Sequence, residues 1–282
     1  MKNPLTGPIL CVIVFALSTV VLAQTAQQQP EGKAPAKPRT PDGKPDLSGV
    51  WVGGTGPGLF GPGAPMELTK WGLEKFRWNR GPEIANAPGV YGGQHQRVDQ
   101  DPIYHCYPPG LVRLGPPLQV VGGFYYHAIQ ILQTAGQVII IYQFRNSLRR
   151  IYTEGREHPQ NLQATWNGHS IGKWDGDTLV VDTIGLRDEA WLDEAGHEFS
   201  PQLHVVERFQ RLNEKTLEIE RTLTDPVALA KPYTIRVALR FNPDYDLNDN
   251  MDGRQYDCTQ FMVRKPLFGE GEGGLLGIAD HP

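Results

Sequence analysis

The chain has 282 residues, of which 21% are charged, and its formal net charge at pH 7 is −4. Charges of both signs are interspersed, so the chain lacks the basic stripe of a nucleic-acid-binding protein, and we expect no nucleic acid among its partners. The 32 glycines and 24 prolines predict many turns and few helices. Without an N-terminal signal, about 260 residues remain, which fits one domain of the larger all-β kind.

The N-terminus has the pattern of an export signal. Lys2 precedes an apolar run, and Ala23 ends that run before a polar stretch. We therefore expect residues 1–23 to be a signal peptide and residues 24–40 to be a disordered, Gln- and Pro-rich linker. The apolar run is short for a membrane span, so no stable membrane insertion is expected after cleavage. The expected location is periplasmic or extracellular.

Removal of the signal leaves two cysteines, Cys106 and Cys258. An even number of cysteines in an oxidising compartment favours one disulfide. Two separate buried thiols are the alternative. No Cys or His spacing typical of a zinc site recruits either residue.

The expected domain covers residues 41–265, followed by a flexible tail at 266–282. A long Gly/Pro-rich loop at 53–65 precedes residues 66–80, which predict one helix beginning near Thr69. After Leu118 the apolar pattern has the period-two spacing of strands. The expected strands are 124–133, 138–144, 148–153, 168–174, 178–184, 203–212, 217–224 and 233–241.

The segment from Gly168 to Gly172 fits the G-x-S-x-G elbow of α/β-hydrolases, which places a nucleophilic serine between a strand and a helix. Its surroundings are different. A turn at Asp175-Gly176 leads into an alternating apolar stretch, which is typical of a β-hairpin. We therefore predict a hairpin over 168–184, with Ser170 inside a strand.

Strands joined mostly by hairpins hide their edges by closing into a barrel or by stacking as a sandwich. The segment Gly49-Val50-Trp51 resembles the Gly-x-Trp first strand of lipocalin-like barrels, in which the tryptophan plugs one end. The expected fold is therefore all-β: an antiparallel meander closing into a lipocalin/calycin-like barrel with long N-terminal loops. A β-sandwich is the alternative.

Several longer motifs carry a second resemblance. They are the GHSIGKWDGDTLVVDT stretch at 168–183, Gly155-Arg-Glu-His-Pro159, and the segments at 41–51 and 203–209. Together they resemble a large family of exported bacterial proteins of unassigned function, typical of acidobacterial genomes. This resemblance covers essentially the whole mature chain. It implies a shared fold and compartment but no activity.

Two charged residues break the apolar alternation of their strands. Glu207 shares a face with Val205 and Phe209, and Arg221 shares a face with Ile219. A three-residue loop would place Glu207 directly opposite Arg221, whereas a four-residue loop would shift them by one. Buried charges must be compensated, so the pair is either structural or part of a ligand pocket.

Histidines supply the expected acid/base chemistry. We predict His169, His204 and Glu207 as catalytic residues, because imidazole exchanges protons near pH 7 and a nearby carboxylate strengthens that role. His127 and His197 are weaker candidates. Neither a metal nor a cofactor motif is present, so none is expected. The predicted ligand-binding residues are His158, Arg150, Tyr152, Trp174 and Arg221.

These residues predict a barrel that binds a small molecule and uses cofactor-free acid/base chemistry such as elimination, hydration or isomerisation. Two alternatives remain open. One is a serine hydrolase that uses Ser170, His204 and either Asp182 or Asp193. The other is a non-catalytic envelope interaction module, favoured if side chains fill the barrel interior.

Overall fold

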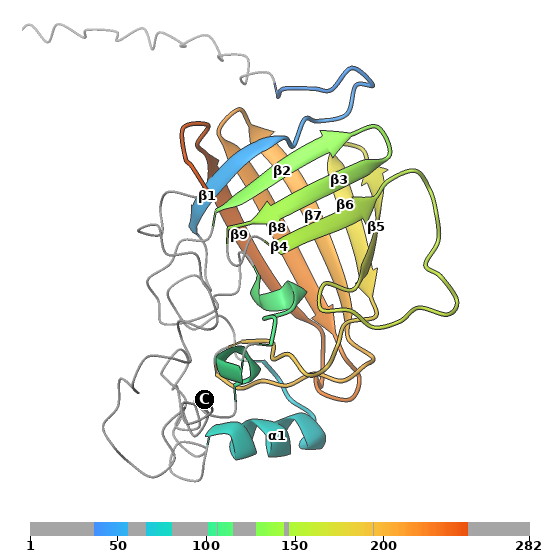
Figure 1. Ribbon diagram of the computed structural model, residues 1–282, viewed down its shortest axis with the longest axis vertical. Helices are drawn as coiled ribbons and strands as arrows, with labels where there is room; N and C mark the ends of the chain where they lie inside the picture. The colour runs from blue at the N-terminus through green and yellow to red at the C-terminus, as the bar shows by residue number, and fades with distance from the viewer. Residues whose placement is uncertain are drawn as a thin grey trace, which may run out of the picture. The chain divides into compact units, whose positions relative to one another are not determined.

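Within the residues that it describes, the computed structural model shows a closed barrel of nine β-strands and one α-helix, which confirms the all-β barrel expected from the sequence (Figure 1). The structure describes residues 37–55, 66–80, 101–105, 107–114, 128–143, 147–193 and 195–247. The strands follow chain order around the barrel, and β1 closes the ring by pairing with β9. The described residues include no helix that is both long and apolar enough to cross a membrane.

Each strand alternates between the barrel interior and the outer face. The strands are β1 (Gly49–Thr55), β2 (Ile129–Thr134), β3 (Gln137–Tyr142), β4 (Ser147–Tyr152), β5 (His169–Asp175), β6 (Thr178–Ile184), β7 (His204–Asn213), β8 (Thr216–Thr224) and β9 (Tyr233–Phe241). In β7 and β8 the odd-numbered residues from Val205 to Arg211 and from Leu217 to Leu223 are all buried. This period of two fixes which side chains meet inside the barrel.

One neighbouring pair of strands differs from the expected antiparallel pattern. Strands β4 and β5 are parallel, with Ile151 opposite Ser170 and Tyr152 opposite Ile171. Every other neighbouring pair is antiparallel. A ring with an odd number of strands cannot alternate direction throughout, so one parallel pair is unavoidable. Parallel strands need a crossover connection of roughly a dozen residues or more, and residues 153–168 supply it.

The predicted hairpins are present. In the hairpin of β5 and β6, Asp175 pairs with Thr178, so the turn is Gly176-Asp177, one residue later than predicted. Gly176 has φ of 57°, in the left-handed region that such a turn favours. The β7–β8 hairpin places Glu207 opposite Arg221. Asn213 pairs with Thr216, so the turn is Glu214-Lys215, and a bulge between Arg211 and Asn213 sets this register.

Trp51 is fully buried at one end of the barrel interior, as the Gly-x-Trp resemblance implied. Its indole Nε1–H donates to the Leu47 carbonyl at 2.9 Å, and its ring packs edge-on against Phe241 with centroids 5.3 Å apart. The Arg211 guanidinium lies 5.1 Å from the Trp51 ring centroid and donates to the carbonyls of Asp46 and Glu214. An aromatic plug and a cation therefore close this end.

A second apolar cluster fills the other end. A 3-10 helix, η3 (Leu111–Arg113), supplies buried Leu111 and Val112, which pack with barrel residues including Val205 and Leu223. The predicted helix is α1 (Lys70–Arg80). Thr69 caps it by accepting a hydrogen bond from the Gly72 N–H at 3.1 Å.

Some predictions lie outside the described residues. These are the signal peptide at 1–23, most of the linker at 24–40, the tail at 266–282, His127, and both cysteines of the predicted disulfide, Cys106 and Cys258. Of the predicted linker, residues 37–40 are described, and Arg39 donates to both carboxylate oxygens of Asp177 at 3.0 Å.

Candidate functional site

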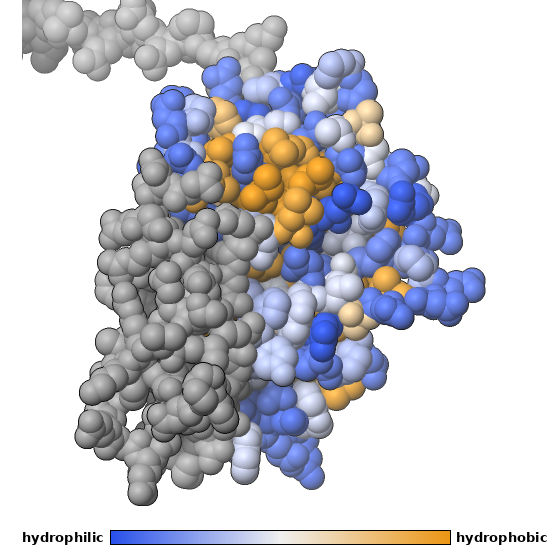
Figure 2. All heavy atoms as spheres, viewed as in Figure 1, coloured by the Kyte–Doolittle hydropathy of each residue, from blue (hydrophilic) through white to orange (hydrophobic). Residues whose placement is uncertain are grey.

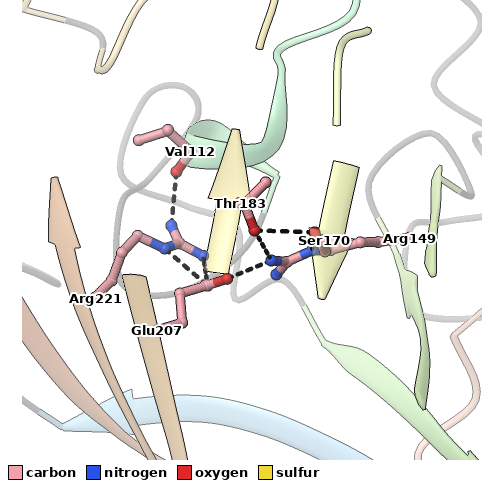
Figure 3. Close-up of polar contacts among 6 residues, drawn as sticks. All are labelled: Val112, Arg149, Ser170, Thr183, Glu207 and Arg221. Carbon is pink, nitrogen blue, oxygen red and sulfur yellow. Dashed lines mark hydrogen bonds and ion pairs between the residues drawn. The ribbon is translucent and has the colours of Figure 1, made fainter. Parts of the chain in front are cut away.

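A network of charged and hydroxyl side chains crosses the barrel interior (Figure 3). Arg221 donates from Nε and Nη2 to Oε1 of Glu207 at 3.0 and 2.9 Å, which confirms the predicted pair. Arg149, on β4, is a second partner whose Nη2 lies 2.6 Å from Oε2 of the same carboxylate. Arg221 also donates to the Val112 carbonyl at 3.0 Å. The carboxylate therefore lies between two guanidiniums, and η3 is attached to the barrel wall through one of them.

Ser170 belongs to this network. Its Oγ accepts a hydrogen bond from Nε of Arg149 at 3.0 Å and lies 2.9 Å from Oγ1 of Thr183. Arg149 Nη2 also donates to Thr183 Oγ1 at 2.9 Å. The network thus joins β4, β5 and β6 to β7 and β8, across the parallel junction. The serine of the G-x-S-x-G motif supports an arginine within a strand.

Burial alone would raise the pKa of the Glu207 carboxyl, but Arg149 and Arg221 outweigh that effect and hold this pKa below its usual range. The side chains of Arg149, Glu207 and Arg221 are at most 2% exposed. A carboxylate that is ionised, enclosed and bonded to two arginines is poorly suited to proton exchange. Glu207 is therefore structural in this arrangement, and the predicted ligand residue Arg221 is its partner.

A different polar cluster lies on the outer face of the same strands. It consists of His169 on β5, Asp182 on β6, His204 on β7, and His158 in the crossover connection. We call these four residues the histidine cluster. The carboxylate of Asp182 bridges two imidazoles: Oδ1 lies 2.9 Å from Nε2 of His158, and Oδ2 lies 2.8 Å from Nε2 of His204. The Nδ1 atoms of His158 and His169 are 2.8 Å apart.

The strand register explains this gathering. On one side of β6, Ile184 pairs with His169 of β5. On its other side, Thr183 pairs with Val205 of β7, so the next residue, Ile184, lies beside His204. Two strand spacings, about 10 Å, thus separate the two histidine backbones. Asp182 lies two residues back on the middle strand, so its side chain reaches toward both histidines. The crossover connection then brings His158 over the sheet.

The cluster is open to solvent. The side chains of Asp182 and His204 are 40% exposed, and that of His158 is 17% exposed. Desolvation lowers the pKa of His169, and the charges of His158 and Arg156 lower it further. His169 is therefore held in its neutral form to lower pH than a free histidine.

Tyr152 and Arg156 border the histidine cluster. The Tyr152 ring stacks on His169 with centroids 5.4 Å apart, and the Arg156 guanidinium lies 3.7 Å from the centre of the Tyr152 ring. Arg150 is exposed on the same face of β4, 5.9 Å from that ring. The structure therefore brings together five of the predicted residues: His158, His169, His204, Tyr152 and Arg150.

The other predicted site residues lie elsewhere. Glu207 points into the barrel while His169 and His204 point outward, so the three predicted catalytic residues do not share one concavity. The three residues separate because alternate residues of a strand face opposite sides of the sheet, and Glu207 differs in parity from His204 on the same strand. Trp174 packs against the interior core, away from the histidine cluster.

The serine hydrolase alternative lacks its required geometry. Ser170 is 1% exposed and faces the interior, whereas His204 and Asp182 face outward. The other candidate acid, Asp193, lies 2.7 Å from Nδ1 of His197. That histidine is buried and stacks on Phe76 with ring centroids 4.3 Å apart.

Two residues of these networks were not predicted in their actual roles. On β4 the predicted site residue is Arg150, whereas its neighbour Arg149 is the buried one. Asp182 was considered only as a hydrolase acid. No local pattern favoured Arg149 over Arg150, because Leu148 and Ile151 put an apolar residue on each face of the strand. Nothing local distinguished Asp182, because its two imidazole partners come from two other segments of the chain.

Within the described ranges, no group of three or more His, Cys, Asp or Glu side chains is arranged to hold a metal ion. In the histidine cluster the ring nitrogens approach one another and the carboxylate instead of converging on a common point. No protein-family model matches the chain, and no curated protein matches its sequence.

Proposed function

We propose that this protein binds a small molecule on its outer wall and catalyses proton transfer there with the histidine cluster. The observation that carries the proposal is the continuous series of contacts from His169 through His158 and Asp182 to His204. Its reaction class is elimination, hydration or isomerisation, each of which needs one base and one acid.

The contacts define which nitrogens can react. When Nε2–H of neutral His158 donates to Asp182, its Nδ1 must accept, so the hydrogen between the two rings belongs to His169 Nδ1. The Nε2 of His169 then carries a lone pair. The lowered pKa of His169 keeps this lone pair available at neutral pH. His169 is accordingly the base.

His204 is suited to be the acid. Its Nε2 lies 2.8 Å from Oδ2 of Asp182, so Nδ1 is the ring nitrogen left for a substrate. In an isomerisation, Nε2 of His169 removes a proton from one substrate carbon, and the imidazolium form of His204 delivers a proton from Nδ1 to another. In an elimination, the second proton goes to the departing hydroxyl group, which leaves as water. Hydration is the reverse of elimination. Both rings are reached by solvent, which resets their protons. These side chains suffice for the transfer, so the proposal invokes no cofactor.

Deuterium exchange tests the reaction class without a known substrate. The full chain is incubated in D₂O with a panel of small oxo- and hydroxy-carboxylates, and carbon-bound deuterium is measured by NMR. We expect incorporation into one class of compound, with a loss of about 10²-fold or more in His169→Ala. His197→Gln is the matched control, because it removes a histidine of a different His–Asp pair. Equal exchange in wild type and in His169→Ala, His204→Ala and Asp182→Asn would contradict the proposal.

A non-catalytic interaction module is the second candidate. It is favoured by the described interior, where apolar side chains and the Arg149–Glu207–Arg221 network are buried. Binding of a compound to the outer wall, with no deuterium exchange for any member of the panel, would favour this candidate over catalysis.

We also propose that the protein is exported to the periplasm or beyond. The basis is the N-terminal sequence pattern. N-terminal sequencing of the exported protein should begin at Gln24, and thiol titration of the denatured, unreduced protein should find no free Cys106 or Cys258. An uncleaved chain with two free thiols would overturn both expectations.

A further inference from the structure

Apolar side chains lie on the solvent face of three adjacent strands. Leu132 pairs with Ile139 and Ile141 pairs with Leu148, all on the outer face. Leu132 is 40% exposed and Leu148 is 53% exposed. Figure 2 shows hydrophobic side chains gathered over β2 and β3, with strongly hydrophilic ones beside them. We call these four residues the apolar strip.

The outer face of such a sheet is ordinarily polar. A contiguous exposed apolar patch with a polar border marks a binding surface more often than an isolated exposed leucine does. We therefore expect a ligand or a partner to bind the apolar strip, and the neighbouring charges indicate the chemistry of that ligand or partner.

An exposed cation lies on this surface. Arg150 pairs with Ile139 across the sheet and shares its strand face with Leu148 and Tyr152. It makes no ion pair with any carboxylate in the described part of the chain. A guanidinium beside aliphatic and aromatic side chains suits an anionic group attached to an apolar body.

The strip is also continuous with the histidine cluster. Along β4 the outer face runs from Leu148 through Arg150 to Tyr152, a span of about 13 Å. Tyr152 then stacks on His169. A molecule seated on the strip with its anion at Arg150 places the adjoining atoms next to the proposed base.

We propose that the apolar strip and Arg150 form a binding subsite for a free anionic amphiphile, namely an acyl or aryl carboxylate or sulfonate. This inference names the substrate class of the proposed catalytic site. It rests on the proposed function only where it concerns catalysis, because binding to the apolar strip does not require the histidines. A free molecule fits better than a membrane, because the strip has only four apolar side chains and a hydrophilic border, whereas membrane association relies on a larger apolar face.

The probe is 8-anilinonaphthalene-1-sulfonate, which joins an anion to an aromatic body, and its binding to the full chain is followed by fluorescence. We expect Leu148→Ser and Arg150→Gln each to raise the dissociation constant by about tenfold. The controls are Leu212→Ser and Arg240→Gln, which change an exposed leucine and an exposed arginine on β7 and β9. Decanoate should displace the probe, and decanol should do so much more weakly.

Equal affinity in wild type, Leu148→Ser and Arg150→Gln would overturn the subsite. Co-flotation with anionic phosphatidylglycerol vesicles that is lost in Leu148→Ser, without probe binding, would show that the occupant is a membrane and also overturn it. The His169→Ala variant separates the two proposals. Retained probe binding with no deuterium exchange in any variant would reject the catalytic function and leave the subsite standing.

Discussion

The two faces of strands β5, β6 and β7 carry two polar networks with opposite properties. Inside, Glu207 is fully buried and bonded to two arginines. Outside, Asp182 is 40% exposed and bonded to two imidazoles. Guanidiniums remain protonated at any physiological pH, whereas imidazoles exchange protons near pH 7. The same sheet thus separates a network that stabilises the fold from one that can exchange protons.

Loss of Glu207 should have the largest effect on stability. Glu207→Ala leaves two buried guanidiniums without their shared carboxylate, which should cost about 3–5 kcal/mol of unfolding free energy. Urea denaturation measures this loss. Replacing Glu207 and Arg221 together by Leu and Met should cost less than the sum of the single changes. Glu220→Ala is the control, because its pair with Arg236 is exposed and should contribute less than about 1 kcal/mol.

The interior network should also set the acid limit of stability. The folded pKa of Glu207 lies below its unfolded value, which is about 4.3. Its stabilising contribution is therefore complete above that pH and is lost as the pH falls through the lower folded pKa. Urea denaturation between about pH 5 and 2 should show a steeper fall in wild type than in Glu207→Gln. If the unfolding free energy falls equally steeply with pH in both proteins, the pKa of Glu207 is the same in the folded and unfolded states.

Gly168 connects the two networks, since the strand after it carries outward His169 and inward Ser170. Gly168 has φ of +63°, and a Cβ there would lie 2.7 Å from the backbone oxygen of Ile184. Gly168→Ala should therefore cost about 2–3 kcal/mol. Gly155 has φ of +88° but open space around its Cβ position, so Gly155→Ala should cost only about 1 kcal/mol. Equal thermal shifts for the two variants would contradict the close approach.

The outer network should contribute least to stability, and its effect should appear in the hydrogen bonding of its histidines. Asp182→Asn is expected to change the unfolding free energy by less than about 1 kcal/mol, because Asp182 and His204 are both 40% exposed. It should nevertheless change the tautomers of His158 and His204, because the carboxylate that accepts from Nε2 of both rings is replaced by an amide. The chemical shifts of the ring nitrogens measure this change by NMR, with His197 as the internal control. Unchanged ring-nitrogen shifts would show that Asp182 does not bridge the imidazoles in solution.

His169 provides a further contrast in pH dependence. Its folded pKa is lowered, so the unfolded chain takes up this proton first as the pH falls below about 6.5. This residue therefore reduces stability on acidification from that pH downward, well before Glu207 begins to titrate. NMR titration should give His169 a lower pKa than that of an ordinary histidine. A value at or above about 6.5 would contradict its assignment as the neutral base.

The sequence alone determined the all-β class, the hairpin over 168–184, the helix near Thr69 and the need for Glu207 and Arg221 to be compensated. These features depend on short-range patterns: period-two alternation, turn glycines and opposite charges in one hairpin register. The buried Trp51 followed in the same way from a local three-residue pattern.

Only the tertiary structure decided the face and the partners of the remaining residues. In Leu148-Arg149-Arg150-Ile151, either arginine could face inward. Each face of the strand carries one arginine and one apolar residue, so the alternation does not show which face is buried. Closure of nine strands required one parallel pair, and its crossover connection brought His158 to Asp182. The histidine cluster is assembled from segments that are distant in the chain, and barrel closure brings them together.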